Sequence, residues 1–175
     1  MAGLRTQKRR RRENKTDYKA RRLMLTSGIP RIVVRRTNKY FILQAVESVE
    51  AQDKVLATIT SKDLLENGWD VNASGSLKSI PAGYLTGILM AKKLKGGKYI
   101  MDLGMARTLS GSRVFAVVKG LIDGGLDISA NKKVFPSEER LNGEHLKPEV
   151  KDMIAKVKGG LATRHTPNKL NEGAK

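Results

Sequence analysis

The sequence predicts an α/β fold with a mixed sheet, in which three antiparallel strands are joined by a parallel strand and helices pack on the sheet. Three apolar blocks rich in Val, Ile and aromatic residues follow one another with short polar connections, which is typical of an antiparallel meander. An amphipathic helical segment then precedes another apolar block, and a strand reached through such a helix crossover normally returns parallel to its neighbour. A basic N-terminal arm precedes the domain.

The chain length of 175 residues suits one domain with tails. We expect residues 1–15 to form a disordered basic arm and residues 16–146 a single α/β domain. Residues 147–175 are expected to form a C-terminal helix followed by a flexible tail. Both ends are too polar to bury a core of their own.

A short helix is predicted directly after the arm. Thr16 can serve as its N-cap, and Gly28 lies just past its end, where a positive φ is easily adopted. Lys19 and Arg22 lie three residues apart and therefore share one face. The residues expected to turn toward the domain are Ala20, Leu23 and Met24.

Residues 31–36, 40–46 and 54–60 predict the three antiparallel strands. Residues 37–39 predict a tight hairpin between the first two. Because side chains alternate along a strand, Ile32 and Val34 lie on the opposite face of the strand from Arg31, Val33 and Arg35. The tip of the hairpin should gather Arg35, Arg36 and Lys39.

Ser79 predicts the start of a helix that carries Pro81 in its first turn and ends at Gly96. Residues 99–103 then predict the fourth strand, parallel to its sheet neighbour. Ser112 can cap the following helix, which Gly124-Gly125 closes.

Residues 148–158 predict a further amphipathic helix, with Val150, Met153, Ile154 and Val157 on its apolar face. Little order is expected beyond Gly159-Gly160.

Positive charge is concentrated at the N-terminus. The first forty residues hold fourteen Lys and Arg against only Glu13 and Asp17, which gives +12 of the formal +17. Residues 8–12 are five consecutive cations. Neutralising phosphates, with release of condensed counterions, is the commonest use of such an arm. A nuclear import or membrane-surface signal is the competing interpretation, but lipid-binding arms usually interleave aromatic residues or leucines, and this one does not.

Composition excludes several classes of function. The chain has no cysteine, which excludes disulfides, thiolate zinc sites and thiol catalysis. Its longest uncharged run, residues 79–91, is shorter than the roughly 18 to 20 residues needed to span a bilayer. We therefore expect a soluble protein with no membrane partner and no small-molecule substrate. No catalytic residue, metal ligand or cofactor is predicted.

Several separated motifs resemble, in order, those of the large-subunit ribosomal protein family that binds 5S ribosomal RNA, in its archaeal and eukaryotic branch. The resemblance covers about residues 9 to 146. The motifs are Lys15-Thr16-Asp17-Tyr18 with Arg21-Arg22, Pro30-Arg31-Ile32-Val33-Val34-Arg35 with Asn38-Lys39, Tyr84-Leu85-Thr86-Gly87, Asp102-Leu103-Gly104, Gly111-Ser112-Arg113-Val114-Phe115-Ala116, and Glu138-Glu139-Arg140 with Gly143-Glu144-His145.

The resemblance implies a structural role without catalysis. With its neighbours, such a protein fixes 5S rRNA onto the central protuberance of the large subunit. The implied partners are 5S rRNA, large-subunit rRNA and neighbouring large-subunit ribosomal proteins, and the implied location is the cytoplasm, in the large ribosomal subunit. The domain over residues 16–146 would then be the RNA-binding one.

The predicted RNA contacts rest on the basic residues together with one helix start. A-form RNA hides its base edges in a deep groove, so a protein that holds folded RNA mainly reads backbone shape with Arg forks and arms. A helix beginning at Ser112 would also present free N–H groups to an anion. The predicted contacts are Arg9, Arg10, Arg11, Arg12, Lys15, Lys19, Arg21 and Arg22; then Arg31, Arg35, Arg36, Asn38 and Lys39; and finally Arg107, Ser110, Ser112 and Arg113.

Two other functions remain open from the sequence. A general basic nucleic-acid-binding protein would bind any duplex of equal length equally well. A nuclease of ribonuclease-H-like outline would need several carboxylates converging at strand ends to bind two metal ions. The first three predicted strands contain no Asp or Glu in their interiors, and only Asp102 is suitably placed.

Overall fold

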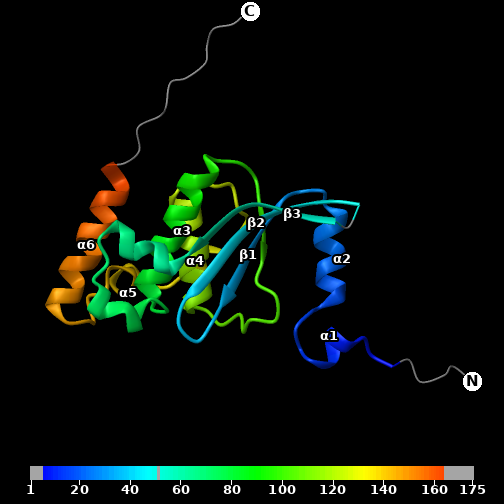
Figure 1. The fold of residues 1–175 in the computed structure, drawn as a ribbon, viewed down its shortest axis with the longest axis horizontal. Helices are drawn as coiled ribbons and strands as arrows, with labels where there is room; N and C mark the ends of the chain where they lie inside the picture. The colour runs from blue at the N-terminus through cyan, green and yellow to red at the C-terminus, as the bar shows by residue number, and fades with distance from the viewer. Residues whose placement is uncertain (1–5, 51, 164–175) are drawn as a thin grey trace, which may run out of the picture.

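The computed structural model describes residues 6–50 and 52–163 and confirms the predicted fold class. Four strands form one sheet in the order β3-β2-β1-β4. They are β1 (Arg31–Arg36), β2 (Phe41–Val49), β3 (Gln52–Thr60) and β4 (Ile100–Asp102). Figure 1 labels β1, β2 and β3 of this sheet. The first three pair antiparallel, and β4 pairs parallel to β1, as the crossover predicts.

The predicted hairpin between β1 and β2 is present. The Thr37 amide donates to the Tyr40 carbonyl at 2.9 Å, and the Thr37 hydroxyl accepts from the Lys39 amide at 3.2 Å. The second hairpin is longer than predicted, because the ladder continues through Glu47, paired with Lys54, and Val49, paired with Gln52. Backbone pairing needs no apolar side chain, so the hydrophobic pattern alone ends β2 too early and begins β3 too late.

Helices α3 (Ile80–Leu94) and α4 (Arg113–Asp123) cover one face of the sheet (Figure 1). The predicted start of α3 is confirmed, since the Ser79 hydroxyl accepts from the Ala82 amide at 3.3 Å. Lys95, at φ 55°, is the C-cap, one residue before the predicted Gly96. Gly124 caps α4.

Helices α3 and α4 approach each other closely because both carry glycine at the contact. A Cβ on Gly87 would lie 2.5 Å from the Val117 carbonyl oxygen, and one on Gly120 would overlap the Tyr84 carbonyl oxygen. The phenol of Tyr84 donates to Asp123 at 3.0 Å across the same interface. Burial of this phenol raises its pKa above the usual range, and the Asp123 carboxylate adds to the increase.

The core has two adjoining parts. The first joins the sheet to α3 and α4 and includes Ile32, Phe41, Leu43 and Leu121. The second includes Leu64, Trp69, Leu85 and Ile154. The elements around the second part are η1 (Ser61–Asn67), η2 (Val71–Ser76), α5 (Glu138–Asn142) and α6 (Pro148–Thr163); η3 (Lys132–Val134) follows α4 in the chain.

The expectation of little order beyond Gly159-Gly160 is wrong up to Thr163. Helix α6 runs through both glycines because Leu161, 2% exposed, is buried in the second part of the core. Tertiary burial outweighs the low helix propensity of two glycines. The tail predicted after this point lies outside the described residues.

The N-terminal segment stands to one side of the sheet and contains α1 (Arg9–Arg12) and α2 (Tyr18–Thr26) (Figure 1). Asp17, not Thr16, caps α2, because its carboxylate accepts from the Lys19 amide at 3.0 Å and the Ala20 amide at 3.3 Å. The expected packing face is wrong for Leu23, which is 65% exposed. Ala20 and Met24 do face the domain, where they line a cleft, but neither α1 nor α2 has a buried residue.

The arm contains one helical turn, Arg9–Arg12, where no regular structure was predicted. Residues 1–5 lie outside the described part. That the arm is disordered without RNA stays a prediction. The boundaries of the α/β domain, after residue 15 and at residue 146, also stay predictions. No helix in the described residues is both long and apolar enough to cross a membrane.

Candidate nucleic-acid interface

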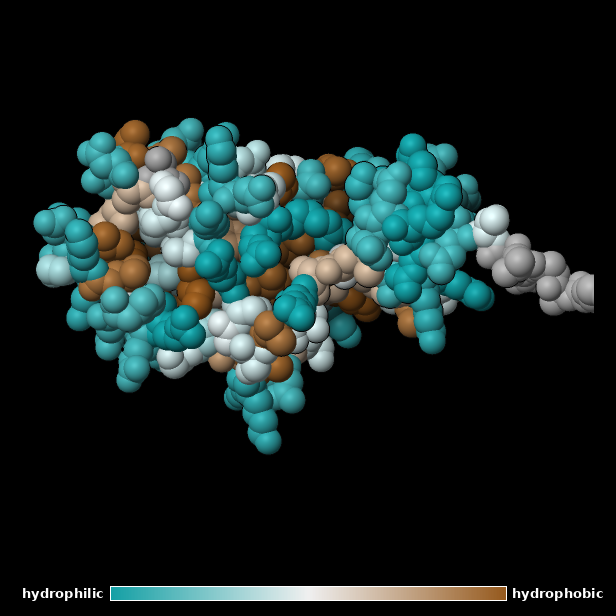
Figure 2. Space-filling view, turned by 90° about the horizontal axis from the view of Figure 1, so that it is seen from below, coloured by the Kyte–Doolittle hydropathy of each residue, from teal (hydrophilic) through white to brown (hydrophobic). Residues whose placement is uncertain are grey.

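Exposed cations cover the end of the molecule formed by α1 and α2. Arg9, Arg10, Arg11 and Arg12 are all exposed, and hydrophilic residues dominate this end in the space-filling view (Figure 2). Glu13 lies 2.8 Å from Lys15 and 3.8 Å from Arg9. Surface ion pairs of this kind contribute about 0 to 1 kcal/mol, so they would not keep a phosphate from these side chains.

Helix α2 adds a second row of cations. Lys19 and Arg22 are exposed, in agreement with the predicted shared face. Arg21 instead turns toward the sheet, where its Nη2 donates to Asp53 Oδ2 at 3.0 Å. The Lys8 ammonium lies 4.7 Å from the centroid of the Tyr18 ring, which is 37% exposed.

Arg31 does not belong to the interface, although it was predicted as an RNA contact. It is 4% exposed, and its guanidinium donates to Ser48 at 2.6 Å and to Asp53 at 2.7 Å. Its Nε lies 3.6 Å from Asp102. A buried cation needs such partners, and these leave it no surface for a phosphate. The alternation rule places Arg31 on the sheet face opposite Ile32 but cannot say whether carboxylates cover it.

Asp53 joins α2 to the sheet through one carboxylate. Partial burial raises its pKa, but hydrogen bonds from Ser48, Arg31 and Arg21 outweigh this effect and lower the pKa from 3.8 to about 2. Asp53 is therefore ionised at neutral pH. It accepts from both Arg21 and Arg31, which fixes the position of α2 relative to β1.

Arg35 is held by Asp102 and turns away from the predicted cluster at the hairpin tip. Its Nη2 donates to Asp102 Oδ1 at 3.1 Å and its Nη1 to the Asp102 carbonyl at 3.0 Å. Asp102 Oδ1 also accepts from the Gly104 amide at 2.9 Å. A Cβ on Gly104 would lie 2.9 Å from the Arg35 guanidinium, so this glycine lets the loop lie against the arginine.

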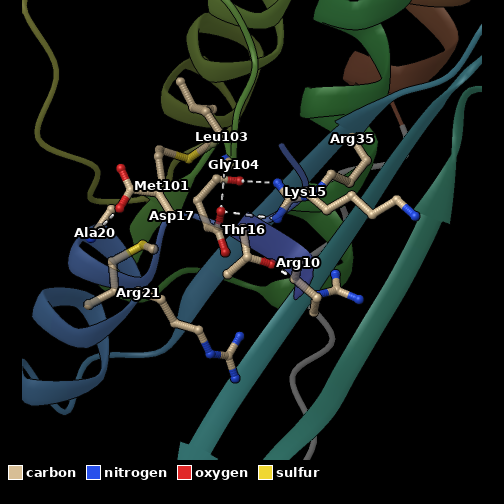
Figure 3. A pocket seen from close by; sticks show the side chains of 12 residues that line it. Arg10, Lys15, Thr16, Asp17, Ala20, Arg21, Arg35, Met101, Leu103 and Gly104 are labelled. Carbon is tan, nitrogen blue, oxygen red and sulfur yellow. Dashed lines mark hydrogen bonds and ion pairs between the residues drawn. The ribbon is translucent and has the colours of Figure 1, made fainter. Parts of the chain in front are cut away.

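A cleft of about 300 Å³ separates the N-terminal segment from the β1–β4 edge of the sheet (Figure 3). It brings together four predicted contact residues from separate parts of the chain: Arg10, Lys15, Arg21 and Arg35. The remaining lining residues are Thr16, Asp17, Ala20, Met24, Met101, Asp102, Leu103 and Gly104. The cleft is therefore cationic, with apolar side chains between the charges.

The other predicted contacts lie elsewhere. Arg36, Asn38 and Lys39 are exposed at the β1–β2 hairpin. Arg107 and Arg113 are also exposed, near the start of α4.

The serines at the start of α4 differ in their bonding. Ser110 donates to the Lys133 carbonyl at 3.0 Å. Ser112 occupies the N-cap position, but its hydroxyl makes no capping bond and is buried without a hydrogen-bond partner among the described residues.

The described carboxylates do not form a nuclease site. Strands β2 and β3 do contain acidic residues, Glu47 and Asp53, because they extend further than predicted. Asp53 and Asp102 both bind Arg31, so a guanidinium lies between them where a nuclease would bind metal. The described part of the chain holds no group of three potential metal ligands.

Sequence reasoning missed the carboxylates that organise this surface. Asp102 lies within the predicted fourth strand and within a recognised motif, which marks it without revealing its partners. Asp53 lay in a predicted connection between strands. Met24 and Met101 carry no signal for a binding site in the sequence, because methionine is usually a core residue.

Comparison with known proteins places the chain in a family. Residues 3–97 and 95–131 match the profile of the ribosomal large subunit proteins 60S L5 and 50S L18. The chain is 43% identical over 141 residues to large ribosomal subunit protein uL18 of Methanoregula boonei, which covers 79% of each chain. It is 45% identical to the protein of that name from Methanoculleus marisnigri, covering 79% of this chain and 78% of the relative. The uL18 protein of Caldivirga maquilingensis is 44% identical, covering 79% of this chain and 67% of the relative. The chain therefore belongs to the family of ribosomal large subunit proteins 60S L5 and 50S L18.

Proposed function

We propose that the protein is a non-catalytic, structural component of the large ribosomal subunit that binds 5S rRNA and helps to anchor it in the central protuberance. It would work in the cytoplasm, within the subunit, and would also touch large-subunit rRNA and neighbouring large-subunit proteins. The observation that carries this proposal is the exposed cationic end formed by α1 and α2, in a chain of a ribosomal family.

Phosphate contact is the main mode of binding. The proposed contacts are Arg9, Arg10, Arg11, Arg12, Lys15, Lys19, Arg21, Arg22, Arg35, Arg36, Asn38, Lys39, Arg107, Ser110, Ser112 and Arg113. Their charges are distributed over the arm, α2, a hairpin and a helix start, so a straight duplex would not reach all of them. A folded RNA with a defined backbone shape would reach all of these residues. We expect residues 1–15 to become ordered on that RNA.

The test is a titration of the purified protein with 5S rRNA from the same organism and with an unrelated structured RNA of the same length, at several salt concentrations. About six to ten phosphate contacts would lower affinity by roughly a thousandfold or more between 50 and 200 mM salt. Clear preference for 5S rRNA at moderate salt supports the proposal. Equal affinity with a steep salt slope would leave only the general basic nucleic-acid binder.

A further inference from the structure

We propose that the cleft between the N-terminal segment and the β1–β4 edge receives one unpaired nucleotide of the bound RNA. Its base would lie on the apolar floor and its phosphate at Arg10 and Lys15. This inference rests on the proposed function. It adds a site for one unstacked base to a surface that otherwise suits phosphates.

The lining of the cleft has two chemically different parts. Met24, Met101 and Leu103 make up the apolar part of the lining, which we call the apolar floor. Figure 3 shows Arg10, Lys15 and Arg35 together on one side of Met101 and Leu103. A phosphate alone would leave the floor exposed to water, and an uncharged apolar ligand would leave the cations unused. A nucleotide has an aromatic base and an anionic phosphate joined by one sugar, so it matches both parts. Thioether groups also make favourable contacts with aromatic rings.

The two carboxylates in the cleft do not repel such a ligand strongly. Asp17 accepts from the first amides of α2, and Asp102 accepts from Arg35 and from the Gly104 amide. Four cations outnumber these two carboxylates, which leaves the lining net positive.

Arg35 is placed to hold the base itself. Its side chain is 44% exposed, and Asp102 fixes the guanidinium against Gly104. A fixed, exposed guanidinium plane can stack on an unpaired base, which is a common mode of recognition for single-stranded RNA. Bases within a duplex stay stacked on their neighbours, so a cleft at the low end of ligand-pocket volumes would admit only a base that has left the helix.

The test fills the cleft without removing a charge. Ala20→Trp puts a bulky side chain on the α2 wall of the cleft, and Leu23→Trp puts the same side chain on the same exposed helix, outside the cleft lining. Both variants and the wild type are titrated with 5S rRNA and with the unrelated structured RNA of the same length across a salt series, after circular dichroism and thermal unfolding have checked the fold.

We expect Ala20→Trp to weaken 5S rRNA binding by about tenfold even at the highest salt concentration, the scale of a single base-stacking interaction, and to lower the salt slope by at most about one, for the phosphate held at Arg10 and Lys15. Leu23→Trp should bind like the wild type, with the same salt slope. Equal affinity of the two variants would overturn the proposal, and so would a loss of affinity confined to low salt, since that result would mean a backbone phosphate alone. Wild-type preference for 5S rRNA is read in the same titration, so failure of the proposed function is distinguishable from failure of the cleft.

Discussion

Arg31 donates a 2.7 Å hydrogen bond from Nη2 to Oδ2 of Asp53, and the same oxygen accepts from Arg21 at 3.0 Å. Arg31 is buried, whereas the Asp53 side chain is 34% exposed at the end of the β2–β3 hairpin. Asp53 therefore joins Arg31, a buried cation of the sheet, to Arg21 of α2, a helix that buries no residue of its own. Arg21 thus adds an ionic contact between α2 and the sheet to the contacts of the half-buried Met24 and Leu25.

Asp53→Asn should lower the free energy of unfolding by about 1 to 3 kcal/mol, because the buried Arg31 would lose the closer of its two carboxylate partners and keep only Asp102, at 3.6 Å. Chemical denaturation measures the change. Asp152→Asn is the matched control: Asp152 is exposed on α6, and its replacement should change stability by less than about 0.5 kcal/mol. Equal effects of the two substitutions would mean that Asp53 does not stabilise Arg31.

Stability should also depend on pH through Asp53. Its folded pKa of about 2 lies below the ordinary 3.8, so its contribution is fully present above about pH 4 and is lost as pH falls from 3.8 toward 2. Denaturation between pH 2 and pH 5 should therefore show a steeper loss of stability for the wild type than for Asp53→Asn. Parallel curves would contradict the assigned pKa.

Gly120→Ala should destabilise the protein by about 1 to 3 kcal/mol, because the added methyl group would overlap the Tyr84 carbonyl oxygen and push α3 and α4 apart. Gly160→Ala, also within a helix, is the control. Its new methyl group would meet no atom within 4 Å, so it should stabilise by about 0.5 to 1 kcal/mol. Thermal or chemical unfolding measures both changes in stability. If Gly160→Ala destabilised the protein as much as Gly120→Ala, the loss could not be assigned to the contact between α3 and α4.

Ser112→Ala should leave stability nearly unchanged, because the buried hydroxyl makes no capping bond and its removal strands no partner among the described residues. Loss of a working N-cap would instead cost about 1 kcal/mol. Because the hydroxyl is buried, an RNA contact at this helix start would come from backbone N–H groups, so the same variant should bind 5S rRNA like the wild type. A severalfold loss of affinity would mean that the Ser112 hydroxyl itself reaches the RNA.

The exposed arginines of α1 should set the salt dependence of RNA binding. Replacing Arg9, Arg11 and Arg12 by Ala should reduce the salt slope by roughly one for each phosphate that is no longer neutralised. The control replaces Lys147, Lys151 and Lys156 by Ala. These lysines are exposed on or beside α6, and their replacement lowers the net charge by the same amount. An equal drop in both triple variants would show that net charge alone, not the arm, governs binding.

The sequence by itself determined most of the local structure. Ser79 caps α3, the β1–β2 hairpin closes at residues 37–39, and β4 returns parallel to β1, because caps, turns and periodicity act over a few residues. The position of the exposed cations at the N-terminus also follows from the sequence, since a run this dense has too few nearby counter-charges to be buried.

Tertiary structure alone decided which of these cations remain available. Arg31 and Asp53 are 22 positions apart, and Arg35 and Asp102 are 67 apart, so no local pattern predicts either pairing. The same holds for α6, which continues past two glycines only because Leu161 meets a core built from distant elements. Burial and charge pairing depend on neighbours in space, and for this reason the cleft between α2 and β4 could not be predicted from the order of residues in the chain.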